Sequence, residues 1–428
     1  MILRDALRSL QKDFSKAFFY WLIFVLTTMF IYLFYNIAMS DPSVDPIKNP
    51  SSTITYVMIL VVILCSVDIL FANDFYVKLK GKDLAVRLIC GGRFTQIAGF
   101  LLAQTMLLLV LAVPLGIFLA NCLLPLVNAM MSSVDQSFAV SSHPEAMLNA
   151  TVILLYVVFW IILLNMSFAY RNAVGLLMNP SSITSASEDS PFGTNLVPKK
   201  AKQIFWIAVF LMPIVLIYWN RSLAILASLI GMVGLNGCLS DVISPWINHQ
   251  VSGRLLKDPD RMAAAGFARR DLRVLKNNIF LFEAGAVILV SMLVNSIGSM
   301  AESMTIFISY LVMACLQALA LMFKFGTEIS GRRRLFLTLN HIGFIQKDQK
   351  KIIHQEILYV YGFVIGVTLL YIFNILLSYT LAGDLSAGTS LFLLGGALLP
   401  LVICAGLNLL LYRKAVFPKD QEARMHAE

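Results

Sequence analysis

Two acidic residues, Asp68 and Glu283, stand inside long apolar stretches of this 428-residue chain. A carboxylate at the centre of a membrane helix costs about 2.5–3.5 kcal/mol on insertion scales, so such acids usually face a bundle interior or water. We consider both as candidate intramembrane polar sites. Each lies near a charged residue that marks the end of its apolar stretch, Asp74 or Lys276. This position favours a hydrogen-bonded structural role over a place on a substrate path.

Other residue patterns that carry chemistry are missing from the sequence. A phosphate-binding loop of the form G-x-x-x-x-G-K-[ST] is absent, because Tyr76 takes the place of its first glycine and Asp83 follows Gly81-Lys82. No nucleophile elbow or zincin helix is present. The six cysteines and five histidines are dispersed without metal-ligand spacing. We predict no catalytic residue, no bound cofactor or metal, and no ATP hydrolysis by the chain itself.

The overall composition indicates which elements must hold the two acids. Hydrophobic residues make up 59% of the chain and charged residues 13%, far more apolar side chain than a soluble core of this length needs. A helix crosses the hydrocarbon core with about 20 mainly apolar residues. The sequence therefore predicts an all-α polytopic membrane protein with ten such runs. The runs are 17–39, 53–72, 97–123, 146–169, 204–218, 223–242, 279–297, 304–323, 357–381 and 389–412.

The net charge of +9 is distributed along the chain in a way that predicts orientation. If the N-terminus is inside and ten helices follow, 31 of the 33 Lys and Arg residues fall on the cytoplasmic side, and Lys48 and Arg221 fall outside. Basic residues near helix ends are retained in the cytoplasm, so we expect both termini to be cytoplasmic. The same distribution indicates a lipid bilayer as the environment and argues against nucleic acid as a partner. We expect the first run to remain in place, because it is too long for a signal-peptide core.

The polar connections suggest a division into two halves. A Ser- and Pro-rich linker, 179–202, separates a first half at 1–178, with four helices, from a second half at 203–428, with six. In the next connection, arginines alternate with apolar residues over 261–275. This stretch predicts either an interfacial helix that meets anionic lipid or simple topology-determining charge.

One segment of the first half recurs in the second. Residues 78–104 resemble a segment that ends 252 positions later, at Glu356. Each has a basic run, spaced apolar residues, a glycine and then a long apolar stretch, with Gly91 and Gly343 in matching places. Since glycine can adopt the positive φ that ends a helix, each segment predicts an amphipathic helix that ends at glycine and is followed by a membrane helix. Two ordinary basic loops are the alternative.

At these two segments the chain resembles the FtsX-like permease family of ABC transporters. Its ten-helix layout is similar to permeases of bacitracin-efflux type from Gram-positive bacteria. The resemblance implies two FtsX-like repeats in a bacterial plasma membrane, with a separate cytoplasmic ATPase dimer, which binds ATP and Mg, docked on short coupling helices. The matching coupling positions are Leu88, Gly91, Gly92 and Arg93 in the first segment and Asn340, Gly343, Phe344 and Lys347 in the second.

The sequence departs from that family in two respects. Bacitracin-efflux permeases carry a large extracellular domain between helices seven and eight, whereas only 298–303 joins them here. This difference argues against peptide sensing and a sensor-kinase partner. The acid expected after the basic run is present as Asp83, but Leu335 stands at the matching place in the second segment. We therefore expect the second docking site to be degenerate.

These observations support one leading hypothesis and two alternatives. The leading one is a permease subunit that couples ATP hydrolysis by a separate ATPase to export, or extraction from the membrane, of an amphipathic substrate such as an antimicrobial peptide. A second is a non-transporting mechanical relay for a membrane or cell-wall partner. A third is a secondary transporter that uses Asp68 and Glu283 to couple ions. A second permease in the complex is compatible with all of these patterns.

Overall fold

The computed structural model describes residues 2–12, 14–40, 53–132, 140–171, 199–219, 224–253, 258–296, 300–330 and 332–417. Throughout these ranges the regular structure is helical and no strand occurs. Ten helices within them are long and apolar enough to cross a membrane, and each matches one predicted run. Several extend well beyond the predicted ends, most of all Pro259–Asn295 and Thr95–Ser132. The prediction of a helical chain with ten candidate membrane spans is confirmed.

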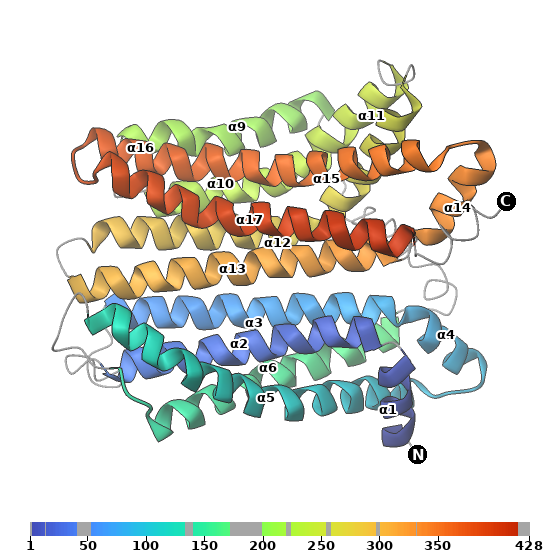
Figure 1. Cartoon of the computed structure of the whole chain (residues 1–428), viewed down its shortest axis with the longest axis horizontal. Helices are drawn as coiled ribbons and strands as arrows, with labels where there is room; N and C mark the ends of the chain where they lie inside the picture. The colour runs from blue at the N-terminus through green and yellow to red at the C-terminus, as the bar shows by residue number, and fades with distance from the viewer. Residues whose placement is uncertain are drawn as a thin grey trace. The chain divides into compact units, whose positions relative to one another are not determined.

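The chain forms two compact units (Figure 1). The first comprises Met1–Leu196 and Gly298–Ser309. Its helices are α1 (Ile2–Lys12), α2 (Phe14–Ser40), α3 (Thr53–Leu79), α4 (Gly81–Ile89), α5 (Phe94–Ser132) and α6 (Pro144–Arg171). α2 packs against α3, α5 and α6, and α1 packs against α5. One buried apolar cluster fixes the short α4 to α1, α3 and α5, and consists of Ala6, Val77, Leu84, Ile97, Phe100 and Leu101.

The second unit comprises Val197–Ile297 and Tyr310–Glu428. Its first helical elements are α9 (Lys199–Trp219), α10 (Ala224–Cys238), η2 (Leu239–Ile243), α11 (Ser244–Ser252), α12 (Pro259–Asn295) and most of α13 (Met300–Ser330). Its later elements are α14 (Arg333–Ile342), α15 (Gln346–Thr368), η4 (Leu369–Phe373), α16 (Asn374–Leu381) and α17 (Ala387–Val416). α12 packs against α10 and α15, and α15 packs against α17. The most apolar stretch of α12 is 72% buried, compared with 11% for α9, so α12 lies at the centre of its unit.

Two membrane spans of the second unit contain a π-helical turn. η2 joins α10 to α11, and η4 joins α15 to α16. The residues that flank both turns keep right-handed helical dihedrals, so each span continues through its π turn. Wide turns of this kind occur often at functional positions. Both pack against α12.

Two features of the sequence acquire a definite place in this fold. The arginine-rich stretch 261–275 is the first part of the continuous helix α12 and does not form a helix of its own. Leu272 and Leu275 of this stretch are buried, because packing inside the unit takes up the apolar face. The predicted linker lies mainly outside the described residues, and its last four residues, 199–202, begin α9.

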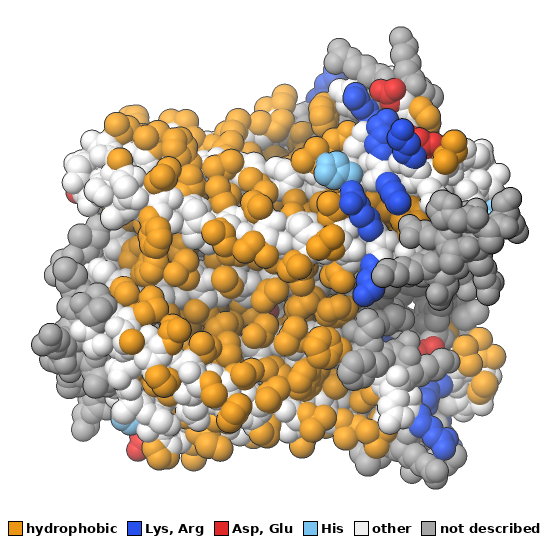
Figure 2. Space-filling view, viewed as in Figure 1, with side chains coloured by type: hydrophobic (Ala, Val, Ile, Leu, Met, Phe, Trp, Pro, Cys, Tyr) orange, Lys and Arg blue, Asp and Glu red, His pale blue; other side chains and the backbone are white. Residues whose placement is uncertain are grey.

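Basic side chains of the second unit gather over the end that carries α11 and α14 (Figure 2). The visible sides of the long helices in the same unit are mainly apolar. This separation is what a helix bundle surrounded by lipid requires, since charged side chains are costly in the hydrocarbon core.

Candidate functional site: two glycine-ended helices and a buried arginine cluster

The first repeated segment has the predicted layout of helix, glycine turn and long helix. α4 ends before Cys90, Gly91 adopts a φ of 87°, and α5 begins at Phe94. The next glycine, Gly92, has no room for a side chain, because a Cβ there would lie 2.7 Å from the backbone oxygen of Arg87. The turn therefore uses both glycines, one for its backbone conformation and the other for a close approach.

The outer surface of this turn is partly apolar. Val86 and Ile89 of α4 are more than half exposed, although α4 lies outside the ten candidate spans. Of the predicted coupling residues, Arg93 is exposed and Leu88 packs against the apolar cluster beneath. A hollow of about 270 Å³ opens at the turn and is lined by Arg87, Cys90, Gly91, Gly92, Gln96 and Ile97.

The second segment has the same layout. α14 ends at Ile342, Gly343 adopts a φ of 110°, and α15 begins at Gln346. The backbone N–H of Phe344 donates to the carbonyl of Leu339 at 3.0 Å, which closes the turn in the way common at glycine-ended helices. The helix–glycine–helix prediction is confirmed at both places.

The surface of the second turn is more apolar than that of the first. Ile342 and Ile345 are each 69% exposed, and they flank the turn at Gly343. Of the predicted coupling residues, Asn340 and Lys347 are exposed and Phe344 is half-buried. Large exposed apolar side chains beyond the end of a membrane span, on a helix that is not itself a span, are typical of a contact surface for another protein.

Each short helix begins at a buried basic residue. Lys80 precedes α4 with 1% of its side chain exposed, and Arg332 precedes α14 with 3% exposed. The two residues are 252 positions apart, as are Gly91 and Gly343. A buried charge is tolerated only when it is paired and hydrogen-bonded. The partners of these cations therefore define what each short helix is attached to.

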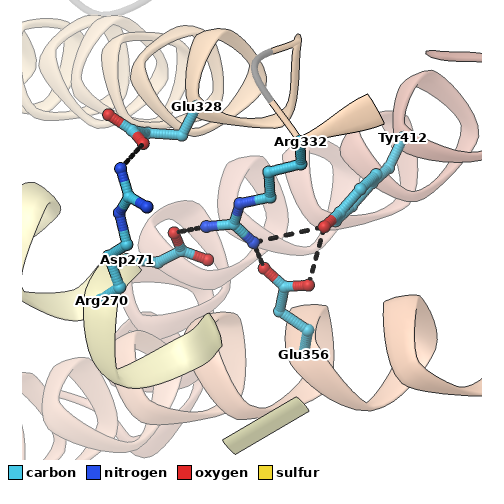
Figure 3. Close-up of polar contacts among 6 residues, drawn as sticks. All are labelled: Arg270, Asp271, Glu328, Arg332, Glu356 and Tyr412. Atoms are coloured by element: carbon cyan, nitrogen blue, oxygen red, sulfur yellow. Dashed lines mark hydrogen bonds and ion pairs between the residues drawn. The ribbon is translucent and has the colours of Figure 1, made fainter. Parts of the chain in front are cut away.

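Arg332 lies in a cluster of polar side chains from three membrane helices (Figure 3). Its guanidinium forms ion pairs with Asp271 of α12 and Glu356 of α15, both of which are fully buried. One guanidinium nitrogen also donates to the hydroxyl of Tyr412, on α17, at 3.2 Å. That hydroxyl in turn donates to Glu356 at 2.9 Å. One arginine thus connects the start of α14 to α12, α15 and α17.

Electrostatics hold the guanidinium in its charged form. Burial acts to lower the pKa of Arg332, but the charge of Asp271 and the other acidic and phenolic groups nearby outweigh it and raise the pKa above its usual value. A second pair lies beside the cluster, with Arg270 3.8 Å from Glu328. Burial raises the pKa of Glu328, and Arg270 opposes that effect only in part. The cluster is therefore a set of charges whose pairing depends on close packing.

Aromatic rings complete the attachment of α14. The guanidinium carbon of Arg332 lies 5.1 Å from the ring centre of Phe267, in cation–π range. Phe336, buried on α14, has its ring centre 5.9 Å from that of Phe267 and 5.9 Å from that of Tyr412, the latter edge to face. Because both the charged and the aromatic contacts reach α12 and α17, α14 is held to the membrane helices at its first turn.

The first unit holds its short helix with other partners. The ammonium group of Lys80 donates to the hydroxyl of Ser9, on α1, at 3.1 Å and lies 3.9 Å from Asp83. Nearby, the hydroxyl of Tyr76 donates to Gln104 at 3.2 Å. Gln104 stands 252 positions before Glu356, so a neutral amide takes the place of the buried acid.

The two intramembrane acids lie in different units. Asp68 is buried on α3, and Glu283 is buried on α12. Thr368 of α15 contacts the Glu283 carboxyl with 2.5 Å between oxygens. Asp68 is therefore buried within the first unit and Glu283 within the second.

Sequence reasoning missed Asp271 and Glu356 as members of a site. Both lie outside the ten predicted apolar runs, and Arg332 is the first residue of a basic run. A signal was present, because each acid falls on the apolar stripe of its helix. On α12 that stripe runs through Ala264, Ala268, Leu272 and Leu275, and on α15 through Ile352, Ile353, Ile357 and Val360. An acid at the spacing of a buried face predicts a buried partner.

No protein-family model matches this chain, and no curated protein matches it.

Proposed function

We propose that the chain is the membrane-spanning permease subunit of an ABC transporter in a bacterial plasma membrane. In this proposal a separate ATPase dimer binds ATP and Mg and docks on α4 and α14. Its cycle moves the membrane helices and so exports, or extracts from the membrane, an amphipathic substrate such as an antimicrobial peptide. The class of cargo comes from the family resemblance of the two repeated segments.

The observation that carries the proposal is the form of the two glycine-ended helices. Each is short, lies outside the candidate spans, and presents large apolar side chains beside its glycine turn. Each leads within a few residues into a long membrane helix, α5 or α15. A partner that pushes on either turn would act directly on a span.

The Arg332 cluster supports the proposal from the membrane side. A movement of α14 has to carry the ion pairs with Asp271 and Glu356 along with it or break them. Breaking a buried pair costs about 3–5 kcal/mol, so a movement of α14 that takes α12, α15 and α17 with it requires less free energy. This rigid attachment is the property that a coupling helix requires.

The test is purification of the tagged chain from its native membranes in mild detergent, with identification of the proteins that accompany it. We expect an ABC ATPase with the unaltered chain and its loss with the double variant Ile342→Asp/Ile345→Asp. The matched control is Leu381→Asp. Leu381 is a 72% exposed apolar residue at the end of α16, the far end of the span that begins with α15. That control should retain the ATPase.

Three results would count against the proposal. Stable, membrane-inserted chain that brings no ATPase in any sample would overturn the permease assignment. An ATPase that stays bound to the double variant would show that α14 is not its docking site. If the ATPase binds as expected but vesicles containing both proteins show no ATP-dependent movement of an amphipathic peptide, transport is the wrong function for the complex.

A further inference from the structure

Glu283 is a fully buried acid on α12, the central helix of the second unit. This helix packs against α10, α15 and both π turns. One carboxyl oxygen contacts the hydroxyl of Thr368, the residue immediately before η4. The other, Oε2, has no hydrogen-bond partner among the described residues.

A count of hydrogens at Thr368 indicates the state of this carboxyl. The hydroxyl oxygen of Thr368 lies 2.5 Å from Glu283 Oε1 and 2.9 Å from the carbonyl oxygen of Val364. A threonine hydroxyl has one hydrogen, and a carboxylate and a carbonyl are both acceptors. Two full hydrogen bonds therefore need a second hydrogen. A neutral Glu283 supplies it by donating its own hydrogen to the Thr368 oxygen, while Thr368 donates to Val364.

Apart from Thr368, the described residues around Glu283 offer an ionised carboxylate no compensation. No Lys, Arg or His among the described residues pairs with Glu283. The phenols within its electrostatic reach, Tyr310 of α13 and Tyr371 of η4, donate their hydrogens to the backbone oxygens of Leu393 and Phe210. An isolated carboxylate in such a site is costly enough that the group takes up a proton instead.

Charged groups on the elements around α12 are paired elsewhere. Asp241 of η2 lies 3.0 Å from Lys202, and the acids of α12 and α15 nearer the α14 end share Arg332. Arg269 and Arg273, earlier on α12, donate to Ser244 of α11. These groups therefore leave the Glu283 carboxyl without a counter-ion.

We propose that Glu283 is a proton-binding site within the membrane, occupied when α12 and the π turn η4 are packed together. The bound proton neutralises Glu283, so the side chain can be buried between α12 and η4 without a cation partner. Separation of α12 from η4 would admit water, favour the carboxylate and release the proton. Since linkage is reciprocal, proton binding favours the packed arrangement by the same free energy with which packing favours proton binding. The proposal does not depend on the identity of any ATPase or cargo.

The test is an infrared difference spectrum between the unaltered chain and Glu283→Gln, both in lipid vesicles. A neutral carboxylic acid has a carbonyl band that is separate from the amide and carboxylate bands. We expect the substitution to remove one neutral-acid band and no carboxylate band at about pH 6, where an exposed glutamate is already ionised. Removal of a carboxylate band instead would overturn the proposal. Glu356→Gln is the control and should remove a carboxylate band, because Arg332 pairs with that acid.

A second measurement uses the unaltered chain and so does not depend on a variant that folds. Dicyclohexylcarbodiimide reacts with neutral carboxyls in apolar surroundings. The acid O–H adds across one C=N bond, and an acyl shift from oxygen to nitrogen then gives a stable N-acylurea with no leaving group. We expect peptide mass spectrometry to find this adduct on Glu283 and none on Glu356. The adduct on Glu356 with none on Glu283 would contradict the proposal.

Discussion

Replacing Arg332 with methionine removes the cation that pairs with two buried acids, Asp271 and Glu356. Methionine fills much of the same volume, so the main effect is the loss of charge. Asp271 and Glu356 would remain fully buried without the cation that pairs with both. Breaking one buried pair by removing a partner costs about 3–5 kcal/mol. Because a single arginine serves both acids and Tyr412, we expect a loss of stability within this range or above it.

The loss can be measured as a shift in melting temperature in detergent. Cys238 and Cys404 are buried in the second unit, so a thiol-reactive dye reports the unfolding of that unit when the other four cysteines are replaced. For a unit of this size about 2–4 °C corresponds to 1 kcal/mol, which gives an expected shift of roughly 6–20 °C. The matched control is Lys351→Met, which removes an exposed cation 2.9 Å from Asp260. Equal melting temperatures for the Arg332 and Lys351 variants would refute the reasoning.

A triple variant separates charge imbalance from simple loss of contacts. Arg332→Met combined with Asp271→Asn and Glu356→Gln removes the cation and both negative charges together. Replacing a complete buried ion set by neutral groups is often close to neutral in stability. We therefore expect the triple variant to recover most of the loss. A triple variant as unstable as the single one would show that the guanidinium acts through packing rather than charge.

Three further predictions concern the turns, the pH dependence and the orientation. Gly343→Ala should lower the free energy of unfolding by about 1–2 kcal/mol, because a residue with a side chain is strained at the φ of 110° that Gly343 adopts. Gly362→Ala is the control and should not lower the melting temperature, because the space around Gly362 is open. Burial raises the pKa of Glu328, so protonation of Glu328 favours the folded state. This contribution to the free energy of unfolding is complete below the pKa of the unfolded chain, about 4.3, and is lost as the pH rises through the pKa of the folded state. Glu328→Gln should therefore raise the melting temperature relative to the unaltered chain at about pH 8 but not at about pH 4, and an equal effect at both values would contradict this. Cys90 is exposed beside the first glycine turn, so in a variant that keeps it as the sole cysteine, a membrane-impermeant maleimide should label it only after cells are opened; labelling of intact cells would reverse the predicted orientation.

The features that could be predicted from the sequence depend on local patterns. A run of about 20 apolar residues needs no tertiary information to indicate a span, and all ten runs were found. The turns at Gly91 and Gly343 were predictable for a similar reason, because glycine readily adopts a positive φ after a helix. The ends of the helices were predicted less accurately from the sequence. α12 begins at Pro259, twenty residues before its predicted apolar run, because helical structure continues outside the apolar stretch.

The buried cluster could not be predicted in the same way, because it depends on contacts between distant parts of the chain. Arg332 and Asp271 are 61 positions apart, and Arg332 and Tyr412 are 80 apart. In sequence, Arg332 is the first of three consecutive arginines, and nothing in its immediate neighbours marks it as the buried one. Only the positions of the acids on the apolar stripes of their own helices distinguish the partners.

The first turns of α4 and α14 are attached to their units by different contacts. This difference bears on the expectation that the second docking site is degenerate. That expectation rested on Leu335 standing where the first segment has Asp83. Asp83 is exposed and lies 3.9 Å from Lys80, so it belongs to the attachment of α4 rather than to its free surface alone. In the second segment Asp271 and Glu356 neutralise the matching cation from within the membrane helices, and no acid is needed on α14 itself. Leu335 is then free to add to the exposed apolar surface beside Ile342, which a docking partner could use. The acid of α4 thus has its counterpart in acids of α12 and α15, and a force applied at α14 would reach α12, α15 and α17 through Arg332.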